Sequence, residues 1–134
     1  MDLVVLDTNI LISAIVFGGK PRQVFDMVIR GEVKLALSPY LLEELQGVLE
    51  GPKFRYPHAM TNTILHELID MAELVSPVKK FDVVKRDSDD NHVLECAFTA
   101  KVDFIISGDE DLLSLKSFQN IPILTADEFL KNFY

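Results

Sequence analysis

Residues 3–9, Leu3-Val4-Val5-Leu6-Asp7-Thr8-Asn9, place an acid directly after a continuous apolar run, and a second apolar segment, residues 10–12, follows at once. An uninterrupted aliphatic run is typical of a parallel strand that is covered on both faces. Asp7 then lies at the carboxyl end of that strand, where open α/β sheets bind ligands. The simpler interpretation is that Asp7, Thr8 or Asn9 only caps the next helix. The tripeptide by itself supports both interpretations equally.

The length and composition predict one globular, ordered domain over residues 1–134, since 49% of the residues are hydrophobic and 25% are charged. No apolar run approaches the roughly 20 residues of a membrane span, and no basic region precedes an apolar one at the amino terminus. We therefore expect neither a transmembrane segment nor a signal peptide, and infer a cytoplasmic protein. The one cysteine, Cys96, permits no internal disulfide, which agrees with a reducing compartment.

The net charge of −8 argues against a simple nucleic-acid binder, because such proteins usually carry a basic face that neutralises phosphates. It does not exclude nucleic acid. Clustered carboxylates that hold divalent cations make a site far less negative than its formal charge. An acidic surface also suits a basic protein partner.

Strand and helix patterns alternate along the chain. We expect strands over residues 3–6, 33–37, 104–107 and 121–124, and helices over residues 9–17, 21–30, 39–50, 61–74, 89–100 and 126–133, with a short helix from residue 109. Residues 78–84 could add a short edge strand. This order predicts an α/β fold, a three-layer α/β/α sandwich around a central, mostly parallel sheet of four to five strands.

Helical geometry sorts the acids of the helix over residues 39–50. Its apolar residues form one arc, Glu43 lies opposite that arc, and Glu44 lies beside Val48 at the border. We expect Glu43 to be solvated. Glu44 can reach over the edge of the core toward the carboxyl ends of the strands, although a surface glutamate that only snorkels into water would fit the same pattern.

The helix near residue 90 carries an acid on its inward side. Its predicted buried face consists of Val93, Leu94, Ala97, Phe98 and Ala100. Asp90 projects into the middle of that face, whereas Glu95 projects away, Cys96 lies off the arc and His92 turns toward solvent. Burying a carboxylate is costly unless it is paired or bound to a cation, so Asp90 indicates a site. Capping of the helix is the alternative explanation for an acid in this first turn.

A second strand end repeats the arrangement found at Asp7. Asp109 lies just beyond the apolar residues 104–106 and opens a short helix, so two strands bring acids to the same edge of the sheet. We interpret Asp111 as a solvent-facing acid of the first turn of that helix, without a role in the site. Capping would account for one of the acids Asp87, Asp89 and Asp90 and leaves a surplus, so the roles of Asp87 and Asp89 stay open.

Acids at positions 7, 44, 90 and 109 would repel one another strongly unless cations lay among them. Mg²⁺ or Mn²⁺ is the natural inference, because these hard cations take oxygen ligands. Zinc is disfavoured, since His58, His66 and His92 lack ligand spacing. The sequence also contains no Gly-rich phosphate loop and no serine nucleophile elbow.

In their order and spacing, Asp7-Thr8-Asn9, Glu44, Asp90 ahead of residues 94–97 (LECA), and Ser107-Gly108-Asp109 resemble the PIN domain over essentially the whole chain. Residues 86–112 are especially similar to the small prokaryotic PIN proteins of the toxin type, the group that includes VapC-like ribonucleases. The resemblance implies a Mg²⁺- or Mn²⁺-dependent endoribonuclease that cleaves single-stranded RNA. It also implies a homodimer and, for a toxin, a cognate antitoxin partner.

The resemblance assigns the four acidic positions to Asp7, Glu44, Asp90 and Asp109. On this assignment Asp7 and Asp109 are direct metal ligands, Asp90 completes the site, and Glu44 holds a coordinated water or a second ion. The motif positions that orient carboxylates or contact phosphate fall on Thr8, Asn9 and Ser107. Ser107 stands where many members have threonine, and the hydroxyl is kept.

Two other functional classes fit parts of the pattern. One is a non-catalytic module whose acids bind a metal or a basic partner. The other is a phosphotransfer domain, but a phosphatase of that type needs an acid where Asn9 stands, and a receiver needs an acceptor aspartate at the end of its middle strand. Lys20, Arg22, Lys53 and Arg55 are candidate contacts to an RNA backbone, and surface solubility explains each of them equally well.

Overall fold

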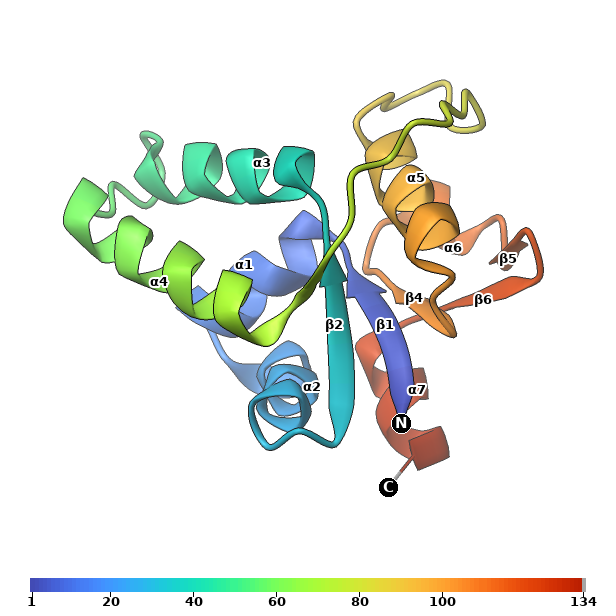
Figure 1. The fold of residues 1–134 in the computed structure, drawn as a ribbon, viewed down its shortest axis with the longest axis horizontal. Helices are drawn as coiled ribbons and strands as arrows, with labels where there is room; N and C mark the ends of the chain where they lie inside the picture. The colour runs from blue at the N-terminus through green and yellow to red at the C-terminus, as the bar shows by residue number, and fades with distance from the viewer. Residues whose placement is uncertain (134) are drawn as a thin grey trace.

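A six-stranded sheet forms the centre of the protein in the computed structural model, which describes residues 1–133 (Figure 1). The strand order is β3-β2-β1-β4-β6-β5, and every neighbouring pair is parallel except β5 and β6. The strands are β1 (Asp2–Leu6), β2 (Val33–Leu37), β3 (Glu73–Leu74), β4 (Phe104–Ile106), β5 (Ser117–Phe118) and β6 (Ile121–Leu124). The predicted α/β fold with a mostly parallel sheet is confirmed.

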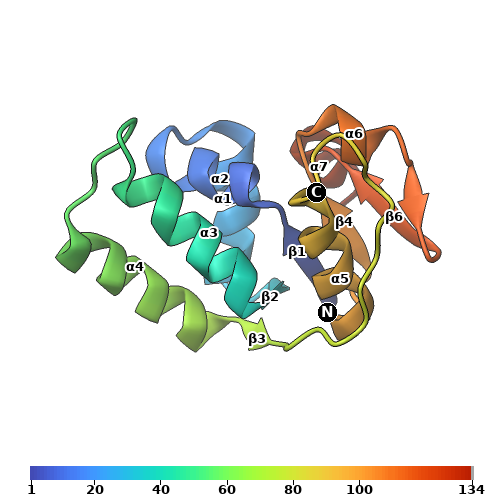
Figure 2. The ribbon, with the colours of Figure 1, turned by 90° about the horizontal axis from the view of Figure 1, so that it is seen from above.

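Seven helices surround this sheet in the described part of the chain. They are α1 (Thr8–Val16), α2 (Gly19–Ile29), α3 (Pro39–Glu50), α4 (His58–Met71), α5 (Asp90–Ala100), α6 (Glu110–Leu113) and α7 (Ala126–Phe133). Helix α5 packs on β1 and β2, whereas α2 contacts β2 and α7, and α7 contacts β6. Seen from above in Figure 2, α3 and α4 lie side by side, and α5 stands across the centre from them.

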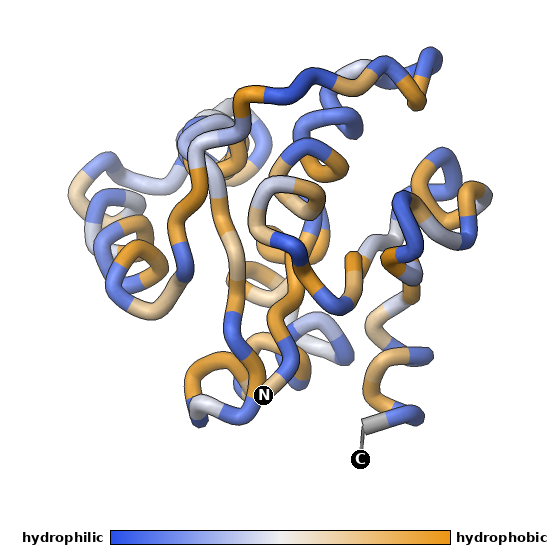
Figure 3. The backbone as a smooth tube through the Cα atoms, turned by 45° about the vertical axis from the view of Figure 1, so that its right-hand side comes forward, coloured by the Kyte–Doolittle hydropathy of each residue, from blue (hydrophilic) through white to orange (hydrophobic). Residues whose placement is uncertain are grey.

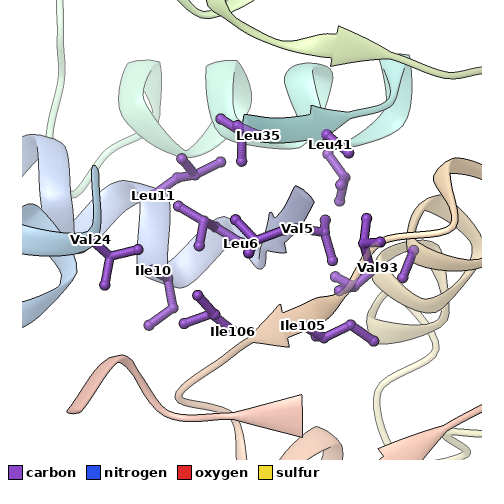
Figure 4. Close-up of a cluster of buried hydrophobic side chains, with 14 of the residues drawn as sticks. Val5, Leu6, Ile10, Leu11, Val24, Leu35, Leu41, Val93, Ile105 and Ile106 are labelled. Atoms are coloured by element: carbon purple, nitrogen blue, oxygen red, sulfur yellow. The ribbon is translucent and has the colours of Figure 1, made fainter. Parts of the chain in front are cut away.

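The apolar run that opens the sequence is the centre of the core. Strand β1 lies between β2 and β4, and Val4, Val5 and Leu6 are fully buried. Figure 4 shows Val5 and Leu6 surrounded by side chains from the neighbouring strands and helices, as expected for a parallel strand covered on both faces. The hydrophobic colouring of the central strands in Figure 3 follows the same arrangement.

The structure differs from the predicted local structure in three places. Residues 78–84, for which the sequence left an edge strand open, form no strand; they belong to an irregular segment, residues 75–89, which we call the strap. Helix α4 covers residues 58–71 rather than 61–74, because it begins directly after Pro57 and the chain enters β3 at Glu73. The sheet has six strands rather than four to five, since the two-residue strands β3 and β5 extend its edges.

The prediction of which α5 residues face solvent is also wrong. Glu95 is only 4% exposed and accepts a hydrogen bond from the backbone N–H of Phe81 in the strap (3.0 Å). Cys96 is fully buried, whereas Phe98, predicted to be buried, is 38% exposed. The strap covers a flank of α5 that a helix with one buried face would show to solvent. Periodicity alone could not reveal this second covered side.

Two other residues of α5 also depart from the predicted pattern. His92 is half-buried and stacks on the ring of Tyr40, and Ala100 is partly exposed. Among residues 1–133, no helix has the length and apolar character needed to span a membrane.

Candidate functional site

Asp7 ends β1 and begins the site. It is 3% exposed; its Oδ1 accepts a hydrogen bond from the Ile10 N–H (2.8 Å) and its Oδ2 accepts one from the Ser107 hydroxyl. The capping interpretation is therefore correct but incomplete, because the second oxygen faces the end of β4. Burial raises the pKa of Asp7 to about 6, against the opposing effect of the hydrogen bonds from Ser107 and Ile10, and the charge of Asp109 adds to the increase.

Ser107 joins the ends of the two central strands. Its buried hydroxyl donates to Asp7 and accepts a hydrogen bond from the Asp109 N–H (2.9 Å). Asp109 itself caps α6 by accepting the Asp111 N–H (2.8 Å). One serine thus sets the positions of both strand-end acids, as expected when parallel strands end at a common edge.

Glu44 crosses the border of the core in the direction predicted from its place on α3. The buried Thr8 hydroxyl donates a hydrogen bond to Glu44 Oε1. Helix α1 carries Thr8 and contacts α3, so this bond joins the first motif to the mid-chain acid. Asn9 is exposed and lines the same cavity as Glu44.

Asp90 lies in the first turn of α5, and its Oδ2 atom is buried with no hydrogen-bond partner among the described residues. Burial raises the pKa of Asp90 to about 7, and the nearby charges of Asp109 and Asp87 raise it further. A buried carboxylate oxygen without a hydrogen-bond partner is costly, so this atom is the observation that most clearly indicates a cation-binding role.

The acids surround a cavity of about 150 Å³. Its lining consists of Asp7, Thr8, Asn9, Glu44, Val48, Asp87, Asp89, Asp90 and Val93. Asp87, Asp90 and Asp109 each offer one carboxylate oxygen, and these three oxygens lie within 4.8 Å of one another. The donors are all oxygens, and one of them lacks a partner, so the residues present fit a hard divalent cation such as Mg²⁺ or Mn²⁺.

The compact group of three includes Asp87, to which the sequence assigned no role. The chain turns at Asp87, because the Asp90 N–H donates to the Asp87 carbonyl (3.1 Å). This turn brings the two side chains to one side, and their spacing of three residues just ahead of a helix was the signal available in the sequence. Asp7 and Glu44 line the same cavity as Asp87 and Asp90.

The neighbouring acids have other partners. Asp89 accepts a hydrogen bond from the Tyr40 hydroxyl (2.9 Å). Desolvation, followed by this hydrogen bond, raises the pKa of Tyr40 to about 12. Asp111 lies 3.7 Å from Arg86, between Oδ1 and Nη1. Asp89 lines the cavity but is absent from the compact carboxylate group, and Asp111 is absent from both.

The predicted RNA-contact cations lie outside the cavity lining. Lys20 pairs with Asp127, and Arg22 pairs with Asp26 (3.0 Å) on its own helix. Lys53 lies over the ring of Phe54, and Arg55 donates to a backbone carbonyl. The structure therefore gives each of these four residues a local partner and brings none of them to the acidic site.

Comparison with known proteins agrees with this arrangement. A family model described as the PIN domain matches residues 3–111. A solved VapBC2 complex from Rickettsia felis, bound to a promoter DNA fragment, contains a similar chain with a TM-score of 0.63 at 15% identity, covering 90% of this chain and 96% of that one.

A chain of the DNA-bound VapBC complex from Salmonella typhimurium is similar as well, with a TM-score of 0.61 at 14% identity over 94% of this chain and 99% of that one. No curated protein sequence gives a significant match. The two structural matches show a shared fold, and the family model covers most of the chain. The chain therefore belongs to the PIN domain family.

Proposed function

We propose that residues 1–134 form one nuclease domain, a Mg²⁺- or Mn²⁺-dependent endoribonuclease that hydrolyses phosphodiester bonds of single-stranded RNA. The observation that carries this proposal is the buried Asp90 Oδ2 without a partner, beside carboxylates of Asp87 and Asp109 within 4.8 Å. Such a group accumulates negative charge that a divalent cation would neutralise. Membership of the PIN family supplies the reaction class.

The proposed ligands are acids that lie in or beside the cavity. Asp90 and Asp109 would hold the ion, and Asp7, which lines the same cavity as Asp90, would join them. Glu44 and Asp87 would hold coordinated water or a second ion. A bound Mg²⁺ or Mn²⁺ supplies Lewis acidity, which polarises the phosphodiester and acidifies water.

The hydroxyl groups hold these carboxylates in position. Ser107 donates to Asp7 and accepts from the Asp109 N–H, so it keeps the two strand-end acids at a constant separation. Thr8 donates to Glu44 and holds that side chain at the cavity. Asn9, exposed at the cavity wall, is the proposed contact to a phosphate oxygen of the substrate. Positioning by such partners keeps the site ordered before the substrate binds.

Activity is tested by incubating single-stranded RNA with the protein and Mn²⁺. Cleavage is expected in the parent and absent in Asp7→Asn. Glu43→Gln, on the exposed side of α3 next to Glu44, is the matched control and should cleave normally. Equal activity in Asp7→Asn and the parent would refute the assignment.

Two further results would favour the other functional classes. A metal-dependent increase in Tm without cleavage would favour a non-catalytic metal-binding module. A stable aspartyl phosphate after treatment with a small phosphodonor would favour a phosphotransfer domain.

The proposal extends to the cellular role, a cytoplasmic toxin that forms a homodimer and is held inactive by an antitoxin. The similar solved chains occur in DNA-bound VapBC complexes, and the net charge of −8 suits a basic protein partner. A small DNA-binding protein encoded next to this chain, which suppresses RNA cleavage when added, is the expected result. A neighbouring gene product that neither binds nor inhibits would count against the toxin role.

A further inference from the structure

Arg86 directly precedes Asp87 in the chain, and Asp87 belongs to the cluster of three carboxylates from Asp87, Asp90 and Asp109, which we call the carboxylate group. The segments on both sides of Arg86 have backbones that hydrogen bonds hold in place. On one side, Asn91 Oδ1 accepts the N–H groups of Val83 and Val84 (3.0 and 2.8 Å), which holds the strap on α5. On the other side, the first turn before α5 holds Asp87. The backbone position of Arg86 is thus set on both sides, while its side chain is 85% exposed.

The Arg86 side chain reaches α6, the helix that Asp109 caps. Its Nη1 lies 3.7 Å from Asp111 Oδ1, and Asp111 follows Asp109 by two residues on α6. The guanidinium therefore joins the segment that carries Asp87 to the helix that begins after Asp109. Figure 2 shows the same approach of the strap toward α6. An ion pair this long and this exposed contributes little to stability, so the guanidinium can leave Asp111 at small cost.

The charge of the site favours such a cation for substrate binding. A phosphodiester that enters meets Asp7, Glu44 and the carboxylate group, all of which repel it until a metal ion binds. Among the ion pairs recorded for the described residues, only that of Arg86 joins a cation to an acid beside the carboxylate group. A guanidinium offers the planar, bidentate donors that match phosphate oxygens.

We propose that Arg86 exchanges Asp111 for the RNA backbone and holds a phosphate of the substrate at the carboxylate site. This inference rests on the proposed ribonuclease function and deepens it, since it names the residue that recognises the polyanionic backbone. Arg86 is then a substrate-binding residue. A contact to phosphate carries no sequence information, so all single-stranded RNA sequences depend on it to the same degree.

The test uses three variants that separate substrate binding from structure. Arg86→Gln removes the charge, Lys85→Gln removes a neighbouring exposed charge that pairs with Asp82 instead, and Asp111→Asn breaks the ion pair but keeps the arginine. For Arg86→Gln we expect roughly 10- to 100-fold lower kcat/KM, the range of a lost charge-assisted hydrogen bond. Lys85→Gln should stay within about twofold of the parent, and Asp111→Asn should cleave at least as fast as the parent.

Three measurements distinguish a phosphate contact from a structural effect. The slope of log(kcat/KM) against log[salt] should become shallower by about one in Arg86→Gln alone. In the inactive Asp7→Asn background, where the RNA stays intact, anisotropy of a labelled single-stranded RNA should show weaker binding once Arg86→Gln is added. The Mn²⁺-induced increase in Tm should be the same in Arg86→Gln and the parent.

The possible failures can be told apart. A parent protein that cleaves no RNA would refute the ribonuclease function and this inference with it. Cleavage by the parent with equal kcat/KM in Arg86→Gln would overturn only the role of Arg86. Equal losses in Arg86→Gln and Lys85→Gln, or a loss in Asp111→Asn that matches Arg86→Gln, would also overturn it, because surface charge or the ion pair itself would then explain the effect.

Discussion

Asp7→Asn should stabilise the metal-free protein, and the gain should depend on pH. Burial raises the pKa of Asp7 from 3.8 to about 6 in the folded state, so the folded protein binds more protons than the unfolded chain between these values. Stability therefore falls as pH rises through this window, and the loss is complete above about pH 6. The difference in pKa corresponds to about 3 kcal/mol of unfolding free energy.

Asparagine is neutral at every pH and escapes this loss. Its carbonyl oxygen can still accept the Ile10 N–H, although the hydrogen bond from Ser107 must reverse or break. That second effect costs about 1 kcal/mol at all pH values. Because this cost does not depend on pH, it does not change the trend. The stability gain of Asp7→Asn over the parent should grow by about 2 kcal/mol between about pH 4 and about pH 7.

Urea unfolding with EDTA, followed by circular dichroism across this pH range, measures the difference directly. Asp70→Asn, which removes an exposed charge from α4, is the matched control and should show no comparable trend. A gain for Asp7→Asn that does not change with pH would refute the argument from burial. Added Mn²⁺ should raise the Tm of the parent and not that of Asp7→Asn; an equal rise in both would remove Asp7 from the cation site.

Three further predictions follow from particular contacts. Asn91→Ala removes the acceptor for the N–H groups of Val83 and Val84 and the donor to the Val84 carbonyl, and it should cost about 2–4 kcal/mol in urea unfolding; an unchanged midpoint would show that the strap is held elsewhere. Mn²⁺ affinity measured by calorimetry should weaken about tenfold for each pH unit below about 7, where Asp90 takes up its proton, and constant affinity down to about pH 5.5 would contradict this. Cys96 is fully buried, and burial raises the pKa of its thiol to about 12. Thiol reagents should therefore modify it only after urea unfolds the protein. Rapid reaction of the native protein would show that the packing around α5 opens readily.

Much of the site was predictable because its acids lie at places that local patterns define. Asp7 directly follows a buried strand and Asp109 follows another after two residues, and parallel strands of one sheet end at a common edge. Asp90 and Glu44 lie on helices whose apolar faces are legible from spacing, so their directions could be worked out. The structure brings Asp7, Glu44 and Asp90 to one cavity and places Asp109 beside Asp90. Their roles as metal ligands stay predictions until the cation is measured.

The strap is the part that local patterns could not predict. It lacks periodicity, and its hold on α5 depends on single polar contacts, from Phe81 to Glu95 and from Val83 and Val84 to Asn91. A side chain that faces away from the sheet looks solvent-exposed until another segment covers it. The same segment carries Asp87 and Arg86 to the site, and for this reason both were missed.

By itself, the sequence determined the order of the four longer strands and of the helices, the buried central strand and the edge at which its acid lies, because each depends on residues close together in the chain. Only the tertiary structure decided which acids lie within ligand distance of one another, and that Asp90 keeps a buried oxygen without a partner. The path of the strap is set by polar contacts with α5 that no periodic pattern reveals. Its course brings Asp87 to the cavity that Asp7, Glu44 and Asp90 line.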